Sequence, residues 1–276
     1  MSKKLEALFT DLDGSLLNDN KEIGELDLIT LQKLKEKGIK VFFATGRHHS
    51  VTRIYAEKLG FDYPFITCNG GLIYDFEEEK PVSAVTIAKD ALCELADLSK
   101  ELGLTYYIYS DKSVFIRPDS PSAQFYHRML NARDGIKDGE IIETKIYDFK
   151  NNDVIKFLIP DCPPDQLQYL KNTDIGKSGT IEFAYSGVDF LDMNAAGGNK
   201  GAAVKKLAKL YNFDISNTFA MGDNDNDISM LKSVGLPVVP YSAKDEIKEY
   251  ANFVTASCND NPITYAIAEL FPELLN

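Results

Sequence analysis

The chain has 276 residues, of which 44% are hydrophobic and 26% charged, and its formal net charge is −12. This length can bury a full core, either as one large domain or as two smaller ones. The acidic balance argues against a surface for nucleic acid or an anionic membrane, because both require clustered lysine and arginine. The four cysteines form no CxxC pair, and no segment approaches the ~20 apolar residues of a spanning helix. We therefore expect a soluble, cytoplasmic protein.

The first part of the chain alternates between strand-like and helix-like segments. Strands are predicted at Leu5–Thr10, Ile39–Ala44 and Tyr63–Cys68, and helices at Glu25–Lys37 and Arg47–Leu59. Gly38 and Gly60 end the two helices, as glycine commonly does. This alternation predicts a parallel sheet with right-handed crossovers, followed by a hairpin arm at Leu72–Tyr74.

From about Pro81 the pattern changes. Strands are predicted at residues 105–110, 113–118, 154–159 and 180–185, and helices at Lys89–Leu102, Pro121–Leu130 and from Pro163 through Leu170. Pairs of neighbouring strands combined with helices indicate an antiparallel α+β insert.

The alternating pattern returns after Gly187. Strands are predicted at 188–194, 217–222 and 236–240, and helices at Lys200–Tyr211, Asn226–Ser233, Asp245–Ala251 and Pro262–Leu270. The sequence thus predicts one α/β domain built from residues 1–82 and 188–276, interrupted by an insert at 83–187.

Four polar clusters directly follow predicted strands, where parallel sheets bind ligands. The first, at residues 11–15, contains Asp11 and Asp13, whose carboxylates can face one site because Gly14 permits a turn. The second, at 44–47, places the Thr45 hydroxyl and free backbone N–H groups at a helix start, where anions bind. Taken singly, these clusters also fit a solvated acidic turn and an ordinary helix cap.

The third cluster, at residues 197–201, is a glycine-rich segment that contains Lys200 and leads into a predicted helix. Such a lysine can place its ammonium group against a phosphate or a developing negative charge. Taken alone, the segment favours a glycine-rich loop with an incidental surface lysine.

The fourth cluster, at residues 222–227, carries three aspartates within five residues, and carboxylate oxygens suit Mg²⁺ or Ca²⁺. An EF-hand loop would need glycine and glutamate at the positions that Ile228 and Val234 occupy, so an EF-hand is excluded. Complementing a helix dipole would explain one or two of these acids, but less easily all three.

In this order, the four clusters resemble the four motifs of the haloacid dehalogenase-like hydrolases and, more narrowly, of the Cof-type phosphatases. The resemblance covers essentially the whole chain and includes the C-terminal segment at 242–267. It implies a Rossmann-like parallel-sheet core at 1–82 and 188–276. It also implies an inserted mixed α/β cap at 83–187, which would select the substrate.

The resemblance implies a Mg²⁺-dependent phosphatase that acts on small phosphorylated metabolites, with sugar phosphates as the first class to expect. Asp11 would be the nucleophile that forms an aspartyl-phosphate, and Asp13 the general acid and base. The groups that would hold the phosphate are the Leu12 N–H, Thr45, Gly46, Lys200 and Asn226. The Mg²⁺ ligands would be the Asp11 carboxylate, the Asp223 carboxylate and the backbone carbonyl of Asp13. Asp227 would support these ligands without binding the ion itself.

Two other functions stay open. A phosphomutase or phosphotransferase would pass the phosphoryl group to an alcohol instead of water. A non-catalytic metabolite-binding or Mg²⁺-binding protein would have kept the fold, although here the nucleophile, the lysine and the metal carboxylates are all present. We expect a small phosphorylated metabolite as the partner, no nucleic acid, no membrane, and a monomer or weak homodimer.

A few residues outside the four clusters bear on these expectations. Basic cap side chains could face the substrate, which offers hydroxyls and negative charge; the candidates are Arg117, His127, Arg128 and Lys156. Adjacent helical side chains point about 100° apart, so His48 and His49 are not expected to share a metal. We expect both histidines to face solvent.

Overall fold

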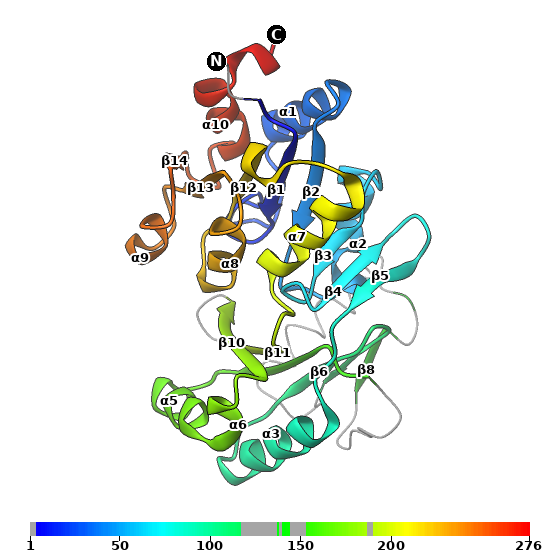
Figure 1. Cartoon of the computed structure of the whole chain (residues 1–276), viewed down its shortest axis with the longest axis vertical. Helices are drawn as coiled ribbons and strands as arrows, with labels where there is room; N and C mark the ends of the chain where they lie inside the picture. The colour runs from blue at the N-terminus through cyan, green and yellow to red at the C-terminus, as the bar shows by residue number, and fades with distance from the viewer. Residues whose placement is uncertain (1–3, 117–136, 138–139, 144–152, 187–189) are drawn as a thin grey trace. The chain divides into compact units, whose positions relative to one another are not determined.

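The computed structural model describes residues 4–116, 137, 140–143, 153–186 and 190–276, drawn in colour in Figure 1. Residue contacts divide the chain into two compact units: unit 1 comprises residues 1–45, 62–66 and 200–276, and unit 2 comprises 46–61 and 67–199. The predicted helix at Pro121–Leu130 and the predicted cap residues Arg117, His127 and Arg128 lie outside the described residues. The division into a catalytic core and a substrate-selecting cap at 83–187 stays a prediction.

Unit 1 contains parallel strands in the order β14-β13-β12-β1-β2-β3. Their bounds are β1 Ala7–Asp11, β2 Lys40–Ala44, β3 Phe65–Thr67, β12 Thr218–Met221, β13 Leu236–Pro240 and β14 Phe253–Thr255. Strand β1 is central, since Leu8 pairs with Val41 of β2 on one side and with Phe219 of β12 on the other. The parallel sheet predicted from the alternating pattern is therefore confirmed.

The helices of unit 1 pack beside these strands. Their bounds are α1 Glu25–Glu36, α7 Lys200–Tyr211, α8 Ile228–Leu231, α9 Asp245–Lys248 and α10 Pro262–Leu270, with 3₁₀ turns at Ile215–Asn217, Asp225–Asp227 and Pro272–Leu274. Helix α1 contacts α10, where the hydroxyls of Thr30 and Thr264 lie 2.9 Å apart, and α7 contacts α8. Within the described ranges, no helix is long and apolar enough to cross a membrane.

An aromatic cluster fixes the centre of this sheet. The rings of Phe9 in β1 and Phe42 in β2 are register partners and stack with centroids 4.6 Å apart. Tyr63, Tyr211 and Phe213 lie against Phe42, with centroids 4.8, 5.7 and 5.6 Å away. Burial of such rings contributes much of a core's stability. Because Phe9 stands two residues before Asp11, this packing also fixes the strand end that carries Asp11.

Unit 2 contains a six-stranded sheet in the order β10-β11-β9-β6-β7-β8, which is antiparallel except for the β7–β8 pair. Its strands are β6 Tyr107–Tyr109, β7 Val114–Ile116, β8 Ile141–Glu143, β9 Lys156–Pro160, β10 Ile181–Ser186 and β11 Phe190–Ala195. The other elements are the hairpin strands β4 Leu72–Asp75 and β5 Lys80–Ala84, and the helices α2 His49–Leu59, α3 Lys89–Glu101, α5 Pro164–Asn172 and α6 Asp174–Lys177.

The predicted antiparallel α+β arrangement is confirmed in unit 2. Its apolar core joins the buried faces of α3 and α5, through residues such as Leu92 and Leu170, to Phe157 of β9. Strand β11, which the sequence places at the return to the first domain, pairs with β9 and β10 and so belongs to this second sheet.

The expectation that His48 and His49 face solvent is wrong, since their exposed fractions are 0% and 3%. The His48 ring caps α2 by accepting the Ser50 N–H, and its Nε2 lies 3.0 Å from the Ser110 carbonyl oxygen. His49 stacks on Tyr74 with centroids 3.9 Å apart. Burial lowers the pKa of both histidines, that of His49 to about 4. The solvent expectation fails because α2 buries most of its residues.

Candidate active site

The first cluster forms a tight turn at the carboxyl end of β1. Asp11 is the last residue of the strand and is 4% exposed. The chain then folds back, with the Leu16 N–H donating to the Asp11 carbonyl at 3.2 Å and the Leu17 N–H donating to the Leu12 carbonyl at 2.7 Å. Gly14 has φ +77°, and a Cβ there would lie 2.3 Å from Asp223 Oδ2. Only glycine therefore lets the turn approach Asp223 this closely.

Lys200 lies at the centre of the site, as the first residue of α7. Its side chain is fully buried, and its Nζ donates to Asp11 Oδ1 at 2.7 Å and to Asp227 Oδ1 at 2.6 Å. The other Asp227 oxygen accepts the N–H groups of Asp223 and Asn224 at 3.0 and 3.1 Å. The carboxylate of Asp227 thus fixes both the lysine and the loop that follows β12.

Three carboxylates from two clusters come together beside this lysine. Asp11, Asp223 and Asp227 each offer an oxygen within 4.8 Å of the others. Burial raises the pKa of Asp11 well above its usual range, and it raises the pKa of Asp223 to about 7, with the Asp227 charge adding to the effect. Ionising all of these acids together is therefore costly without further positive charge. Closely spaced oxygen ligands fit a hard divalent cation, so these carboxylates could hold a metal ion.

Asp13 is less buried than Asp11 and Asp227. Its side chain is 36% exposed, and its Oδ1 lies 2.9 Å from the Nζ of Lys21, which is 54% exposed. The sequence analysis did not identify Lys21, because its contact depends on the loop at residues 18–23, where the Asn18 N–H donates to the Glu22 carbonyl. The spacing of eight residues between Asp13 and Lys21 does not by itself indicate that their side chains meet.

The second cluster is carried by the neighbouring strand. Ala44, the last residue of β2, pairs with Asp11, so Thr45 follows at the same edge of the sheet. Thr45 is buried at 1% exposure, and its N–H donates to the Ile66 carbonyl at 2.8 Å. Gly46 follows it directly, and Asn226 lies in the 3₁₀ turn that contains Asp227. Parallel pairing of β1 with β2 and β12 brings the segments that carry Asp11, Thr45 and Asp223 to one edge of the sheet.

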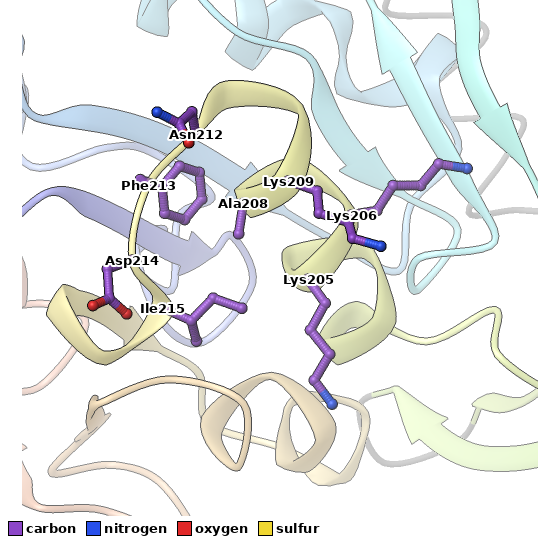
Figure 2. Close-up of a pocket in the computed structure, with 8 residues that line it drawn as sticks. All are labelled: Lys205, Lys206, Ala208, Lys209, Asn212, Phe213, Asp214 and Ile215. Carbon is purple, nitrogen blue, oxygen red and sulfur yellow. The ribbon is translucent and has the colours of Figure 1, made fainter.

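A shallow cavity of about 880 Å³ lies elsewhere, near the C-terminal end of α7 (Figure 2). Three exposed lysines and the loop at 212–215 line it; the lysines are Lys205, Lys206 and Lys209. Lys209 follows Lys200 by nine residues, which is roughly 14 Å along a helix. None of the predicted site residues lines this cavity, so it is separate from the carboxylate cluster.

Comparison with known proteins gives this arrangement a family context. A family model described as haloacid dehalogenase-like hydrolase matches residues 8–267. The candidate phosphatase MG265 of Mycoplasma genitalium is 30% identical over 278 residues, covering 97% of this chain and 99% of that protein. The 5-amino-6-(5-phospho-D-ribitylamino)uracil phosphatase YcsE of Bacillus subtilis is 27% identical, covering 95% and 94%. Among solved structures, BT1666 from Bacteroides thetaiotaomicron has a TM-score of 0.81 at 21% identity, covering 98% and 96%, and so supports the fold.

Proposed function

Because the chain belongs to the haloacid dehalogenase-like hydrolases and is a phosphomonoesterase, we propose that it hydrolyses small phosphorylated metabolites with the help of Mg²⁺. Sugar phosphates are the first class proposed. YcsE supports this choice, since its name gives a substrate with phosphate on a sugar-derived ribityl chain. The observation that carries the proposal is the buried Asp11 carboxylate, held by Lys200 at 2.7 Å beside two further carboxylates.

In this proposal Mg²⁺ is held by the Asp11 carboxylate, the backbone carbonyl of Asp13 and the Asp223 carboxylate. Asp227 supports them, because its two oxygens already bind Lys200 and two backbone N–H groups. When bound, Mg²⁺ supplies positive charge that offsets the repulsion between a carboxylate and a phosphate dianion. The ion suits the site because it prefers a few carboxylates together with water and phosphate oxygens.

Phosphoryl transfer then proceeds in two displacements. An oxygen of Asp11 attacks phosphorus while the ester P–O bond breaks, and Asp13 protonates the departing alkoxide, leaving an aspartyl-phosphate. Water then attacks phosphorus and gives a proton to Asp13, and the bond from phosphorus to Asp11 breaks. The half-exposed position of Asp13 supports this role, since the acid has to exchange protons with water.

The remaining site residues hold the transferring group. Lys200 neutralises its charge, and the other proposed donors are the Thr45 hydroxyl, the Asn226 side chain and the N–H groups of Leu12 and Gly46. Burial alone would lower the pKa of Lys200. The negative charges of Asp11 and Asp227 nevertheless raise this pKa above its usual value. The lysine therefore keeps its charge throughout the physiological pH range.

The proposal is tested by assaying the purified protein with Mg²⁺ against p-nitrophenyl phosphate and a panel of phosphorylated metabolites. Release of inorganic phosphate is expected from wild type. It should be abolished by Asp11→Asn and by EDTA, and retained by Asp225→Asn, which alters an exposed acid of the same loop. An active Asp11→Asn protein, with deamidation excluded by mass spectrometry, would overturn the nucleophile assignment.

The same assay separates the alternative functions. A phosphomutase or phosphotransferase would give an isomerised or newly phosphorylated product in place of steady phosphate release. A non-catalytic binding protein would bind Mg²⁺ and phosphate without turnover on any compound of the panel.

A further inference from the structure

Unit 2 contains a buried lysine that none of the proposed catalytic roles uses. Lys156, in β9, is 1% exposed, and its Nζ lies 2.6 Å from Asp192 Oδ1 in the neighbouring strand β11. The other oxygen of Asp192 accepts Asn69 Nδ2 at 2.7 Å, and the Lys156 ammonium lies 5.0 Å from the ring centroid of Tyr109. A buried ion pair of this kind contributes little net stability, because desolvation offsets its attraction. Net stabilisation of the sheet therefore does not account for Lys156, and its other contacts point to a further role.

The Lys156 ammonium also binds the backbone next to the second cluster. Its Nζ donates to the Gly46 carbonyl oxygen at 3.0 Å. The residues on either side are fixed by backbone hydrogen bonds, from the Thr45 N–H to the Ile66 carbonyl and from the Cys68 N–H to the Arg47 carbonyl, at 2.8 and 2.9 Å. Lys156 thus holds a carbonyl that lies between two fixed points of the turn.

Fixing that carbonyl has a defined geometric effect. A peptide group is planar, so the orientation of the Gly46 carbonyl sets the plane of the whole Gly46–Arg47 peptide. That plane restricts the backbone dihedral angles of Gly46, a residue that has no side chain to limit them. A hydrogen bond from a charged donor is roughly twice as strong as one between neutral groups, which makes lysine an effective anchor here.

We propose that Lys156, held by Asp192 and Asn69, is a positioning residue for phosphate binding that keeps the turn at Thr45 and Gly46 in its binding conformation. This inference rests on the proposed phosphatase function of the same turn. It changes the role expected for Lys156, which the sequence placed among cap residues facing the substrate. In the structure its ammonium binds Asp192 and the Gly46 carbonyl, so it acts on the phosphate through the backbone.

The variant that tests this role is Lys156→Met combined with Asp192→Asn. It removes the donor to Gly46 without leaving an unpaired buried charge, which Lys156→Met alone would do. The matched control is Leu158→Ala, which is 3% exposed, lies in the same strand and pairs in register with Asp192. This control destabilises the same sheet by creating a cavity but leaves the contact with Gly46 in place.

The measurement is the Kd of inorganic phosphate in the presence of Mg²⁺ by isothermal titration, with the melting temperature recorded for each protein. The double variant should bind phosphate about tenfold more weakly, whereas Leu158→Ala should stay within twofold of wild type even if it melts lower. A double variant that binds phosphate as wild type does would overturn the inference and leave a structural ion pair.

Two further measurements keep the test decisive. If the double variant does not fold, Asn69→Ala replaces it, since it removes the hydrogen bond that Asn69 donates to Asp192. At least threefold weaker phosphate binding then supports the inference, and unchanged binding overturns it. The titration requires no turnover, so a wild-type protein without phosphatase activity would refute the proposed function separately from the role of Lys156.

Discussion

Lys200 and Asp227 form an enclosed ion pair, with Nζ 2.6 Å from Oδ1 and both side chains at 0% exposure. Replacing either partner is costly even though the intact pair adds little stability, because loss of the Asp227 charge leaves Lys200 with Asp11 alone, and loss of the Lys200 charge leaves both carboxylates uncompensated.

We expect Asp227→Asn to lower the free energy of unfolding by about 3 to 5 kcal/mol. It should also lower kcat at least tenfold, because Lys200 loses one of the two oxygens that fix it beside Asp11. Urea unfolding and steady-state kinetics measure the two effects. Asp225→Asn is the control and should stay within about 0.5 kcal/mol of wild type. A stable, fully active Asp227→Asn protein would contradict this account of the pair.

Substitution of Gly14 tests whether the close contact between Gly14 of the first cluster and Asp223 of the fourth cluster is needed. We expect Gly14→Ala to lose Mg²⁺ binding and most activity, because the new Cβ would lie 2.3 Å from Asp223 Oδ2. Gly38→Ala is the matched control: its φ is +80°, close to the +77° of Gly14, but no atom lies within 4 Å of the new Cβ. Both variants should carry similar backbone strain, so equal losses of activity would show that the clash with Asp223 is unimportant.

Metal removal should change stability as well as activity. Mg²⁺ is expected to raise the melting temperature at pH 7.5, because it binds the folded site and compensates the buried carboxylates. Asp223→Asn should weaken Mg²⁺ binding at least tenfold and reduce this shift. Differential scanning calorimetry with Mg²⁺ or EDTA gives the comparison. An equal Mg²⁺-dependent shift in the two proteins would exclude Asp223 as a ligand.

A pH effect is expected from Asp27 in α1, far from the metal carboxylates in the sequence. Burial raises its pKa to about 6, although Thr264 donates two hydrogen bonds of 2.8 Å to Oδ1. An unfolded aspartate has a pKa of about 3.9, so between about pH 4 and pH 6 the folded state binds more protons and stability falls as pH rises. The loss should reach about 3 kcal/mol at most, since each pKa unit corresponds to 1.36 kcal/mol.

Asp27→Asn removes this titration while keeping an acceptor for Thr264. The free energy of unfolding is measured in EDTA at pH 4.5, 5.5, 6.5 and 7.5 for both proteins. The value for the variant minus the value for wild type should therefore increase as pH rises. The other acids titrate in both proteins and cancel in this difference. A difference that does not change with pH would show that Asp27 titrates normally in the folded state.

The sequence predicted those parts of the fold that depend on local patterns. The bounds of α7, β13 and α10 agree with prediction, because apolar spacing together with glycine or proline marks their ends. Strands β5, β8 and β14 were not predicted. Strand β5, KPVSA, is polar and contains Pro81, which argues against a strand until its pairing with β4 is known.

The order of the sequence motifs proposed the members of the site, and the structure adds contacts that the motifs did not indicate. Motif order indicated Asp11, Lys200 and Asp223, since each follows a predicted strand of a parallel sheet. The pairing of Asp13 with Lys21 was not predicted, because it depends on a loop conformation. The burial of His48 was also missed, since it follows from packing against a turn 62 residues later in the chain.

The central position of β1 has a consequence for synthesis of the chain. Ala7 pairs with Lys40 on one side but with Thr218 on the other, so one edge of this apolar strand is completed only near the end of translation. At 5 to 20 residues per second, the interval between β2 and β12 lasts roughly 10 to 40 s. During that time the nascent chain has an unpaired edge that invites aggregation, and Asp11 lacks Lys200. The carboxylate of Asp11 therefore gains its partner lysine only after about 200 residues have been synthesised.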